Sequence, residues 1–445
     1  MTAYQPATAL PRDFLNRKDV STAIAAHDFG AVFHLARSKA GISYSKIAAE
    51  CDIKPERVGA LARGQGSITT FEKIAKIADA LRIPGHMLGL APRTWESEPS
   101  GQVPRVPAGT ITESRDGEDA VRRREFFKAS ASAGLAVGLP EIDQLKAGGR
   151  IGRAIPEQLR KRTERLRRLD DVLGGGDTYR VYLGEHLATK KLIRDGHYTE
   201  TTGRALLSVL AEQAQQAGWA AFDGGRHTDA SSLYEDSYQA AIQAGDNSLA
   251  GNALAFLAYQ KISGDRKAGI EIAVTACRTA GPEAPPGVRA LLYERLAWAY
   301  AIANQASSAE EALSDAETAL EESAGTPQPD WVAWVDRNEL QIMTGRCWAE
   351  LRRPLRAVPA LESALTEYGD IHARDKSLYL SWLADSYISA GEIEQAASTT
   401  SRALELSAGV ASVRPRHRIA PTLRRLSSHR ELPAVAEVLE QAQAS

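Results

Sequence analysis

The stretch QQAGWAAFDGGRHTDASSLYEDSY, residues 215–238, recurs in outline along the C-terminal half of the chain. WLADSYISAGEIEQAASTTSRAL, residues 382–404, is a second copy. The shared pattern is a small residue, a contact residue, a turn residue, an alanine and a further contact residue: Gly218, Ala221, Gly225, Ala230 and Tyr234, then Ala384, Tyr387, Gly391, Ala396 and Thr400. Small residues at this spacing let two helices cross closely, so the pattern predicts repeated pairs of antiparallel helices.

Two further copies and one weaker copy fill the region between these stretches. They are Ala297, Tyr300, Ala309 and Leu313; Gly345, Trp348, Ala357 and Leu361; and, less regularly, Ala258 to Cys277. The copies resemble the tetratricopeptide repeat, although they are longer than its usual unit of about 34 residues. The resemblance implies an α-solenoid with a concave surface for a peptide, small-molecule or protein effector. An irregular helical bundle is the alternative.

The composition fits a folded, mainly helical chain of several domains. Among 445 residues, 43% are hydrophobic and 25% are charged, and alanine is abundant. The net charge of -2 hides an uneven distribution, because residues 1–95 and 120–195 are basic whereas residues 196–445 are acidic. Five segments are expected: an N-terminal tail (1–27), a helical domain (28–90), an acidic Pro/Gly-rich linker (91–120), a basic and apolar hinge with a helix (121–176) and the repeats (177–445).

Residues 41–90, GISYSKIAAECDIKPERVGALARGQGSITTFEKIAKIADALRIPGHMLGL, carry the most specific pattern. Ser43 is a natural N-cap of a short helix, Asp52 falls where the chain must turn, and Pro55 opens a second helix that Gly64 closes. Apolar residues are spaced to form a small core with both helices: Phe29, Val32, Phe33, Ile47, Ala48, Ile53, Val58, Leu61, Phe71, Ile74, Ala78 and Leu81.

This pattern resembles the Cro/repressor type of helix-turn-helix domain, with five helices in order over residues 28–90. In that family the second helix of the motif enters the major groove of double-stranded DNA. The resemblance places Lys54, Glu56 and Arg57 at base edges. It places Ser43, Tyr44, Lys46 and Arg63 at backbone phosphates.

Departures from the family pattern limit how many bases this motif can read. Asp52 stands where glycine is usual, but aspartate tolerates the left-handed backbone that the turn needs. Pro55 replaces a glutamine that often reads bases, and Gly59 and Ala60 shorten the exposed face of the helix. A helical module that contacts protein rather than DNA is the alternative interpretation.

Residues 122–140, RRREFFKASASAGLAVGLP, resemble a twin-arginine export signal, but they lie far from the N-terminus and their apolar run is too short to cross a bilayer. The first thirty residues lack the apolar core of a leader, and the three cysteines, Cys51, Cys277 and Cys347, are sparse and far apart. We therefore expect a cytoplasmic protein without membrane contact, in which residues 122–140 act as a hinge. Export or membrane tethering is the alternative.

A basic helix is expected at residues 156–173, either as a solvated face packed on the first repeat or as an accessory phosphate-binding surface. No metal-ligand spacing, nucleophile motif or phosphate loop is present in the sequence. We therefore expect no enzyme activity, catalytic residue, metal or cofactor.

The order of these segments resembles a large group of actinobacterial transcriptional regulators. The motifs that carry it are the Cro/repressor-type domain, RRREFF, LRRLDDVLGGGDTY and AGWAAFDGGRH. The resemblance implies a homodimeric, sequence-specific DNA-binding regulator whose repeats bind an effector or partner. The alternative is a repeat scaffold or adaptor that binds a protein client and uses the helix-turn-helix domain as a protein-contact module.

Overall fold

The computed structural model describes residues 6 and 8–88 apart from 67, 69 and 70, then 93, 95 and 96, and residues 150–444 apart from 171–174 and 409. Within these ranges the chain is helical and has no strand; an isolated parallel bridge joins Arg150 to His197. The expected hinge at 122–140 and most of the expected linker lie outside the described residues. Two compact units divide the chain, Met1–Gln65 with Glu72–Gln144, and Gly66–Phe71 with Leu145–Ser445.

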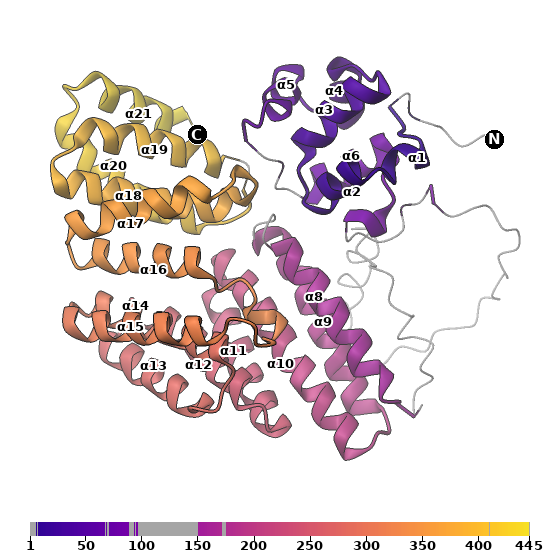
Figure 1. The fold of residues 1–445 in the computed structure, drawn as a ribbon, viewed down its shortest axis with the longest axis vertical. Helices are drawn as coiled ribbons and strands as arrows, with labels where there is room; N and C mark the ends of the chain where they lie inside the picture. The colour runs from indigo at the N-terminus through magenta and orange to yellow at the C-terminus, as the bar shows by residue number, and fades with distance from the viewer. Residues whose placement is uncertain are drawn as a thin grey trace, which may run out of the picture. The chain divides into compact units, whose positions relative to one another are not determined.

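The helices of the first unit are short and lie packed against one another (Figure 1). Many of their apolar residues are buried. The helices are α1 (Arg12–Leu15), α2 (Lys18–Ala25), α3 (Phe29–Ala40), α4 (Tyr44–Cys51), α5 (Pro55–Ala62), α6 (Phe71–Leu81) and the 3-10 helix η1 (Gly85–Leu88). The predicted core residues are buried except Ile53, which is half-buried, and Phe71, whose side chain is outside the described residues.

Residues 1–27 were predicted to be an N-terminal tail, but the described part of this segment is folded into the first unit. They contain α1 and α2, and apolar side chains such as Phe14, Leu15 and Ile24 are buried in the first unit. Before α1, the Thr8 hydroxyl donates to the carbonyl of Ala80 at 2.7 Å, and a backbone hydrogen bond of 2.9 Å joins Leu10 to Leu81. The segment therefore closes over the end of α6.

The expected linker also begins later than residue 91. Arg93 pairs with Asp79 of α6 through both guanidinium arms, at 2.8 and 2.6 Å, and Trp95 Nε1 donates to the same carboxylate at 2.9 Å. Glu96 accepts from the backbone N–H of Gly85 at 2.7 Å. Arg93, Trp95 and Glu96 thus belong to the folded unit.

The second unit begins with α8 (Ala154–Asp170) and α9 (Gly175–Asp195) and continues as paired helices (Figure 1). The pairs are α10 (Glu200–Asp223) with α11 (His227–Ala244), α12 (Asn247–Lys261) with α13 (Arg266–Ala280), α14 (Pro286–Ile302) with α15 (Ala306–Glu322), α16 (Arg337–Glu350) with α17 (Pro354–Glu367), and α18 (Ala373–Ala390) with α19 (Ile393–Ser407). The chain ends with α20 (Arg414–Leu426) and α21 (Pro433–Ala444), and short 3-10 turns occur at Asp330–Val332, Asp370–His372 and Ser427–His429.

These pairs stack into an all-α solenoid. The first helix of each pair also contacts the first helix of the next, from α10 through α12, α14 and α16 to α18. Within a pair, the small residues of the sequence pattern meet the larger ones. A Cβ on Gly218 would lie 2.5 Å from the ring of buried Tyr234, and a Cβ on Gly345 would lie 2.5 Å from Leu361. Because that space is already taken, glycine sets how closely the helices approach.

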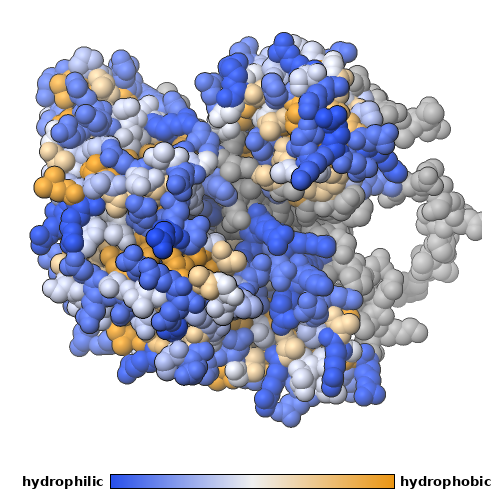
Figure 2. Space-filling model, in the orientation of Figure 1, coloured by the Kyte–Doolittle hydropathy of each residue, from blue (hydrophilic) through white to orange (hydrophobic). Residues whose placement is uncertain are grey.

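Helix α8 packs on α9 and α10, and its basic residues divide between two environments. Arg162 is buried and pairs with Glu185, whereas Arg167 pairs with Glu212 at 2.8 Å and also with Asp330. The helix is otherwise hydrophilic on the face seen in Figure 2. Two of its arginines therefore hold α8 to the solenoid, and its exposed basic residues, Lys161, Arg165 and Arg168, form a solvated face.

The C-terminal segment returns to the start of the solenoid. The side chain of buried Asp223, at the end of α10, accepts from the hydroxyl of Ser412 and from the backbone N–H of Gly175, both at 2.8 Å. Its carbonyl accepts from the N–H of Val413 at 3.0 Å. Helix α20 then runs beside α18 and α19. Its Arg414 and Arg418 lie over the rings of Trp219 in α10 and Trp382 in α18, so α20 meets part of the surface formed by the first helices of the pairs, called the inner helices below.

Candidate functional site

The first candidate site is formed by α4, the turn after it and α5. Ser43 is the N-cap of α4, where its hydroxyl accepts from the N–H of Lys46 at 3.3 Å. Asp52 ends the helix with φ 54° and ψ 49°, the left-handed geometry that aspartate tolerates. Lys76 of α6 contacts the Asp52 carboxylate at 3.0 Å. Pro55 then begins α5, where a missing N–H costs nothing.

A close helix crossing positions α5 in the first unit. A Cβ on Gly30 of α3 would lie 2.1 Å from the carbonyl oxygen of Leu61, so the two backbones touch there. On the buried side of α4 and α5, Ile47, Val58 and Leu61 are at most 1% exposed. This packing leaves the opposite side of α5 facing solvent.

The residues predicted to face bases lie together at the start of α5. Lys54 is the residue before the helix, and Glu56 and Arg57 belong to its first turn. All three side chains are exposed. Positive and negative groups at the open end of a helix can contact the edges of nucleic-acid bases or a charged protein surface.

The residues predicted to contact phosphate are more scattered. Lys46 and Arg63 are exposed, and Arg63 is the residue that follows α5. The hydroxyl of Ser43 is already used as a helix cap. The guanidinium of Arg37 lies 4.5 Å from the ring centre of Tyr44, an arrangement that holds a cation beside the start of α4. Arg37 was not predicted as a site residue. It lies on the preceding helix, six residues before Ser43, and nothing in the local sequence indicates that it would meet Tyr44.

A second cluster lies along the inner helices of the solenoid, where arginines alternate with aromatic rings. The guanidinium of Arg414 lies 4.5 Å from the Trp219 ring centre, and that of Arg346 lies 4.3 Å from Trp382 and 4.6 Å from Trp298. Such contacts stabilise buried cations, although each is worth only about 0.5–2 kcal/mol.

Tyr259 of α12 is surrounded by the positive charges of three arginines. Its hydroxyl accepts from Arg346 at 3.1 Å and lies 3.3 Å from Arg414, and Arg295 lies over its ring. Burial alone would raise the pKa of Tyr259, but the three arginines lower the pKa to about 8.

Buried carboxyl groups stand near these arginines. Glu294 of α14 is fully buried, and neither of its oxygens has a hydrogen-bond partner among the described residues. Glu339 of α16 is buried too and is hydrogen-bonded by the hydroxyl of Tyr379 at 3.1 Å. Burial raises the pKa of both groups, and their mutual repulsion raises that of Glu294 further.

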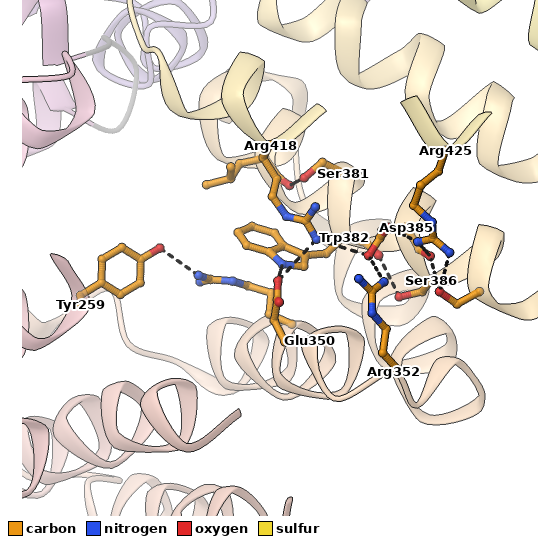
Figure 3. Close-up of polar contacts among 12 residues, drawn as sticks. Tyr259, Glu350, Arg352, Ser381, Trp382, Asp385, Ser386, Arg418 and Arg425 are labelled. Carbon is orange, nitrogen blue, oxygen red and sulfur yellow. Dashed lines mark hydrogen bonds and ion pairs between the residues drawn. The ribbon is translucent and has the colours of Figure 1, made fainter. Parts of the chain in front are cut away.

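At the other end of the inner face, α16, α18 and α20 surround a hollow of about 490 Å3. Figure 3 shows how Asp385 lies between arginines from different elements, and their contacts join the end of α16, α18 and α20. Arg352 approaches the Asp385 carboxylate to 2.8 Å, Arg418 to 3.6 Å, and Arg425 forms a shorter ion pair with it. Glu350 accepts from Trp382 Nε1 at 2.9 Å.

None of the residues that line this hollow was predicted as a site residue from the sequence. The segment RPRHRIAPTLRRL of α20 is strongly basic within an acidic half, and that contrast was a usable signal. It did not indicate which acids the arginines would meet, because Asp385 and Glu350 come from other repeats.

Cysteine thiols, groups of metal-ligating side chains and long apolar helices would each indicate another kind of site. Burial raises the pKa of the thiols of Cys51, Cys277 and Cys347 to about 12, 11 and 12, so they are protonated at neutral pH. Among the residues that the structure describes, no three His, Cys, Asp or Glu side chains are grouped to hold a metal ion. No described helix has the length and apolar character needed to cross a membrane.

Comparison with known proteins does not assign the chain to a family. No protein-family model matches it, and no curated protein matches its sequence significantly.

Proposed function

We propose that this protein is a sequence-specific, DNA-binding transcriptional regulator of the Cro/repressor helix-turn-helix class, with a tetratricopeptide-like repeat domain that binds an effector or partner. The observation that carries the proposal is the arrangement of α4, the left-handed Asp52 turn and α5, with Lys54 exposed just before α5 and Glu56 and Arg57 exposed on its first turn. In a helix-turn-helix protein this is the part of the second helix that contacts base edges.

The proposed roles follow from the chemistry of each side chain. Arg57 can donate two hydrogen bonds to O6 and N7 of guanine, and Glu56 can accept from N4 of cytosine. Lys46 and Arg63 supply positive charge for phosphates, and Tyr44 with the Arg37 guanidinium beside its ring can grip the backbone near the start of α4. Few base contacts are available from one copy, so we propose that a homodimer reads two half-sites about 34 Å apart.

Binding of the purified full chain to genomic DNA fragments, selected and sequenced over a range of salt concentrations, tests this function. We expect a recurring motif with two-fold symmetry, and affinity that falls steeply as salt rises. Failure to enrich any sequence, with weak binding to all fragments, would favour the alternative of a scaffold that uses the first unit for protein contact.

Two substitutions then test the orientation of α5. Arg57→Ala should weaken binding by about 1–3 kcal/mol and relax selectivity at one base position, whereas Arg63→Ala should weaken binding to all sequences and reduce the salt slope by about one. Arg12→Ala, an exposed arginine on α1, is the matched control and should leave both quantities unchanged. Unchanged selectivity in Arg57→Ala would mean that α5 is not the reading helix.

A further inference from the structure

The hollow between α16, α18 and α20 has an excess of positive charge. Four arginines line it, Arg352, Arg418, Arg424 and Arg425, against two acids, Glu350 and Asp385. The acids are already engaged, since Asp385 meets three of the arginines and Glu350 meets Trp382 and Arg418. Two positive charges therefore remain uncompensated by the lining.

Several hydrogen-bond donors of these arginines are still available. The Arg424 side chain is exposed and forms no hydrogen bond or ion pair with any residue that the structure describes. Arg352, 61% exposed, donates to Asp385 through NH1 only, and a guanidinium has five N–H donors.

The bonds to Asp385 fix the direction of the guanidinium groups of Arg352, Arg418 and Arg425 before any ligand arrives. Arg425 is held twice more, by the Asp385 carbonyl at 3.2 Å and by Ser389 Oγ at 3.1 Å. Arginines that are already oriented lose less freedom on binding, and their planar forks match the oxygens of phosphate. The lining is otherwise polar, with Pro421 as its apolar member, so it offers little to an apolar or aromatic ligand body.

From this geometry we infer that the hollow is a binding site for a small molecule carrying more than one phosphoryl charge, with Arg352 and Arg424 as its main contacts. The inference rests on the proposed function and deepens it, because it names the chemical class of the effector. A ligand in this hollow would contact α20 and the end of α16 together. It would thereby stabilise the position of α20 on the inner helices.

Calorimetric titration of the full chain in 0.15 M NaCl tests the inference, with pyrophosphate and ATP as probes and citrate as a non-phosphoryl anion of similar charge. We expect saturable binding of pyrophosphate with one site per chain, and much weaker binding of citrate. ATP binding without pyrophosphate binding would show recognition of the nucleoside, for which this lining offers little surface, and would overturn the inference. No saturable binding of either phosphate, or equal binding of citrate, would overturn the inference.

Matched variants locate the binding. Arg424→Gln and Arg352→Gln should each weaken phosphate binding by about tenfold or more, because each removes charged hydrogen bonds. Arg430→Gln, an exposed arginine just beyond α20 and outside the lining, should bind as the parent does. An equal loss in Arg430→Gln, or none in Arg424→Gln with a normal melting temperature, would place the ligand elsewhere.

DNA binding is measured separately so that the two proposals can fail independently. Arg424→Gln should keep its affinity for DNA, because Arg424 belongs to the second unit. Displacement of bound pyrophosphate from the parent chain by random duplex DNA would show that the hollow contacts a nucleic-acid backbone, and would overturn the small-molecule assignment. Phosphate binding by a chain that selects no DNA sequence would refute the proposed regulator but leave the site intact.

Discussion

The core of the first unit is apolar, whereas the interior of the second unit contains many charged side chains. Val32, Phe33 and Ile47 are fully buried in the first unit, and its buried Thr8 and His27 each meet a backbone carbonyl. The second unit buries Asp223, Glu294, Arg346, Arg374 and Asp385.

The difference follows from how the two units bury their helices. In the first unit, apolar faces converge on one small core, and burial of that surface is the main stabilising term. In the second unit the stacked pairs share an apolar core that runs from one pair to the next, and the inner helices present part of a second face to α20. Charged and aromatic residues on that face specify one position for α20, but each unpaired charge there is costly. The stability of the first unit should therefore depend mainly on how well its buried side chains fit together. The stability of the second unit should depend more on whether its buried charges are paired.

The largest effect is expected for Asp385→Asn in the second unit. The change leaves three guanidinium groups without their shared counter-charge, at a position where the carboxylate is 7% exposed. We expect a loss of about 3 kcal/mol in the free energy of unfolding. This value is at the low end of the range for breaking a buried ion pair, because Arg352 and Arg425 still reach solvent. Urea unfolding, with hydrogen exchange to locate the change, measures it. Asp315→Asn, at an exposed position, is the control; equal stability of the two variants would contradict a structural role for Asp385.

A smaller loss, about 2 kcal/mol, is expected for Gly30→Ala in the first unit. The new methyl group would press on the backbone of α5 at Leu61, which cannot move aside as a side chain can. Gly59→Ala is a control of opposite sign, because its Cβ would make only an ordinary contact with Arg63 and alanine favours a helix. Hydrogen exchange should show faster opening of the first unit in Gly30→Ala alone. A Gly30→Ala protein as stable as the parent would mean that the two helices separate easily.

The third effect is smallest for any single step of one pH unit, and it concerns a buried carboxyl group of the second unit. Burial raises the folded-state pKa of Glu294, so the folded chain holds a proton that the unfolded chain releases above its ordinary carboxyl pKa. Stability should therefore fall as pH rises from that range toward the raised pKa, by at most about 1.4 kcal/mol per unit for one proton. Arg295 and Arg346 face this group and moderate the effect, whereas the neighbouring carboxyl groups of Glu339 and Asp336 increase it.

Glu294→Gln should flatten this pH dependence, because the amide resembles the protonated acid in size and stays neutral. The measurement is the free energy of unfolding between pH 5 and 8, with exposed Glu317→Gln as the matched control. A slope identical in Glu294→Gln and in the parent would show that another group binds the proton.

Much of the local structure could be predicted from the sequence. The Ser43 cap, the left-handed Asp52, the Pro55 start of α5 and the close crossing of Gly218 with Tyr234 all depend on residues near one another in the chain. Hydrophobic spacing likewise predicted most of the core of the first unit. The exposed positions of Lys54, Glu56 and Arg57 followed from the same spacing, whereas their proposed contact with DNA rests on the resemblance.

What the sequence by itself determined is the set of helices, their caps and the pairing of neighbours, since backbone preference and short-range spacing fix these. Only the tertiary structure decided that residues 8–10 close over α6, that Ser412 meets Asp223 across 189 residues, and that Arg352, Arg418 and Arg425 share Asp385. Each of these contacts joins distant parts of the chain. From the sequence alone, an exposed arginine cannot be distinguished from one that forms an ion pair inside the fold. The partner is chosen by packing, and packing depends on the whole unit.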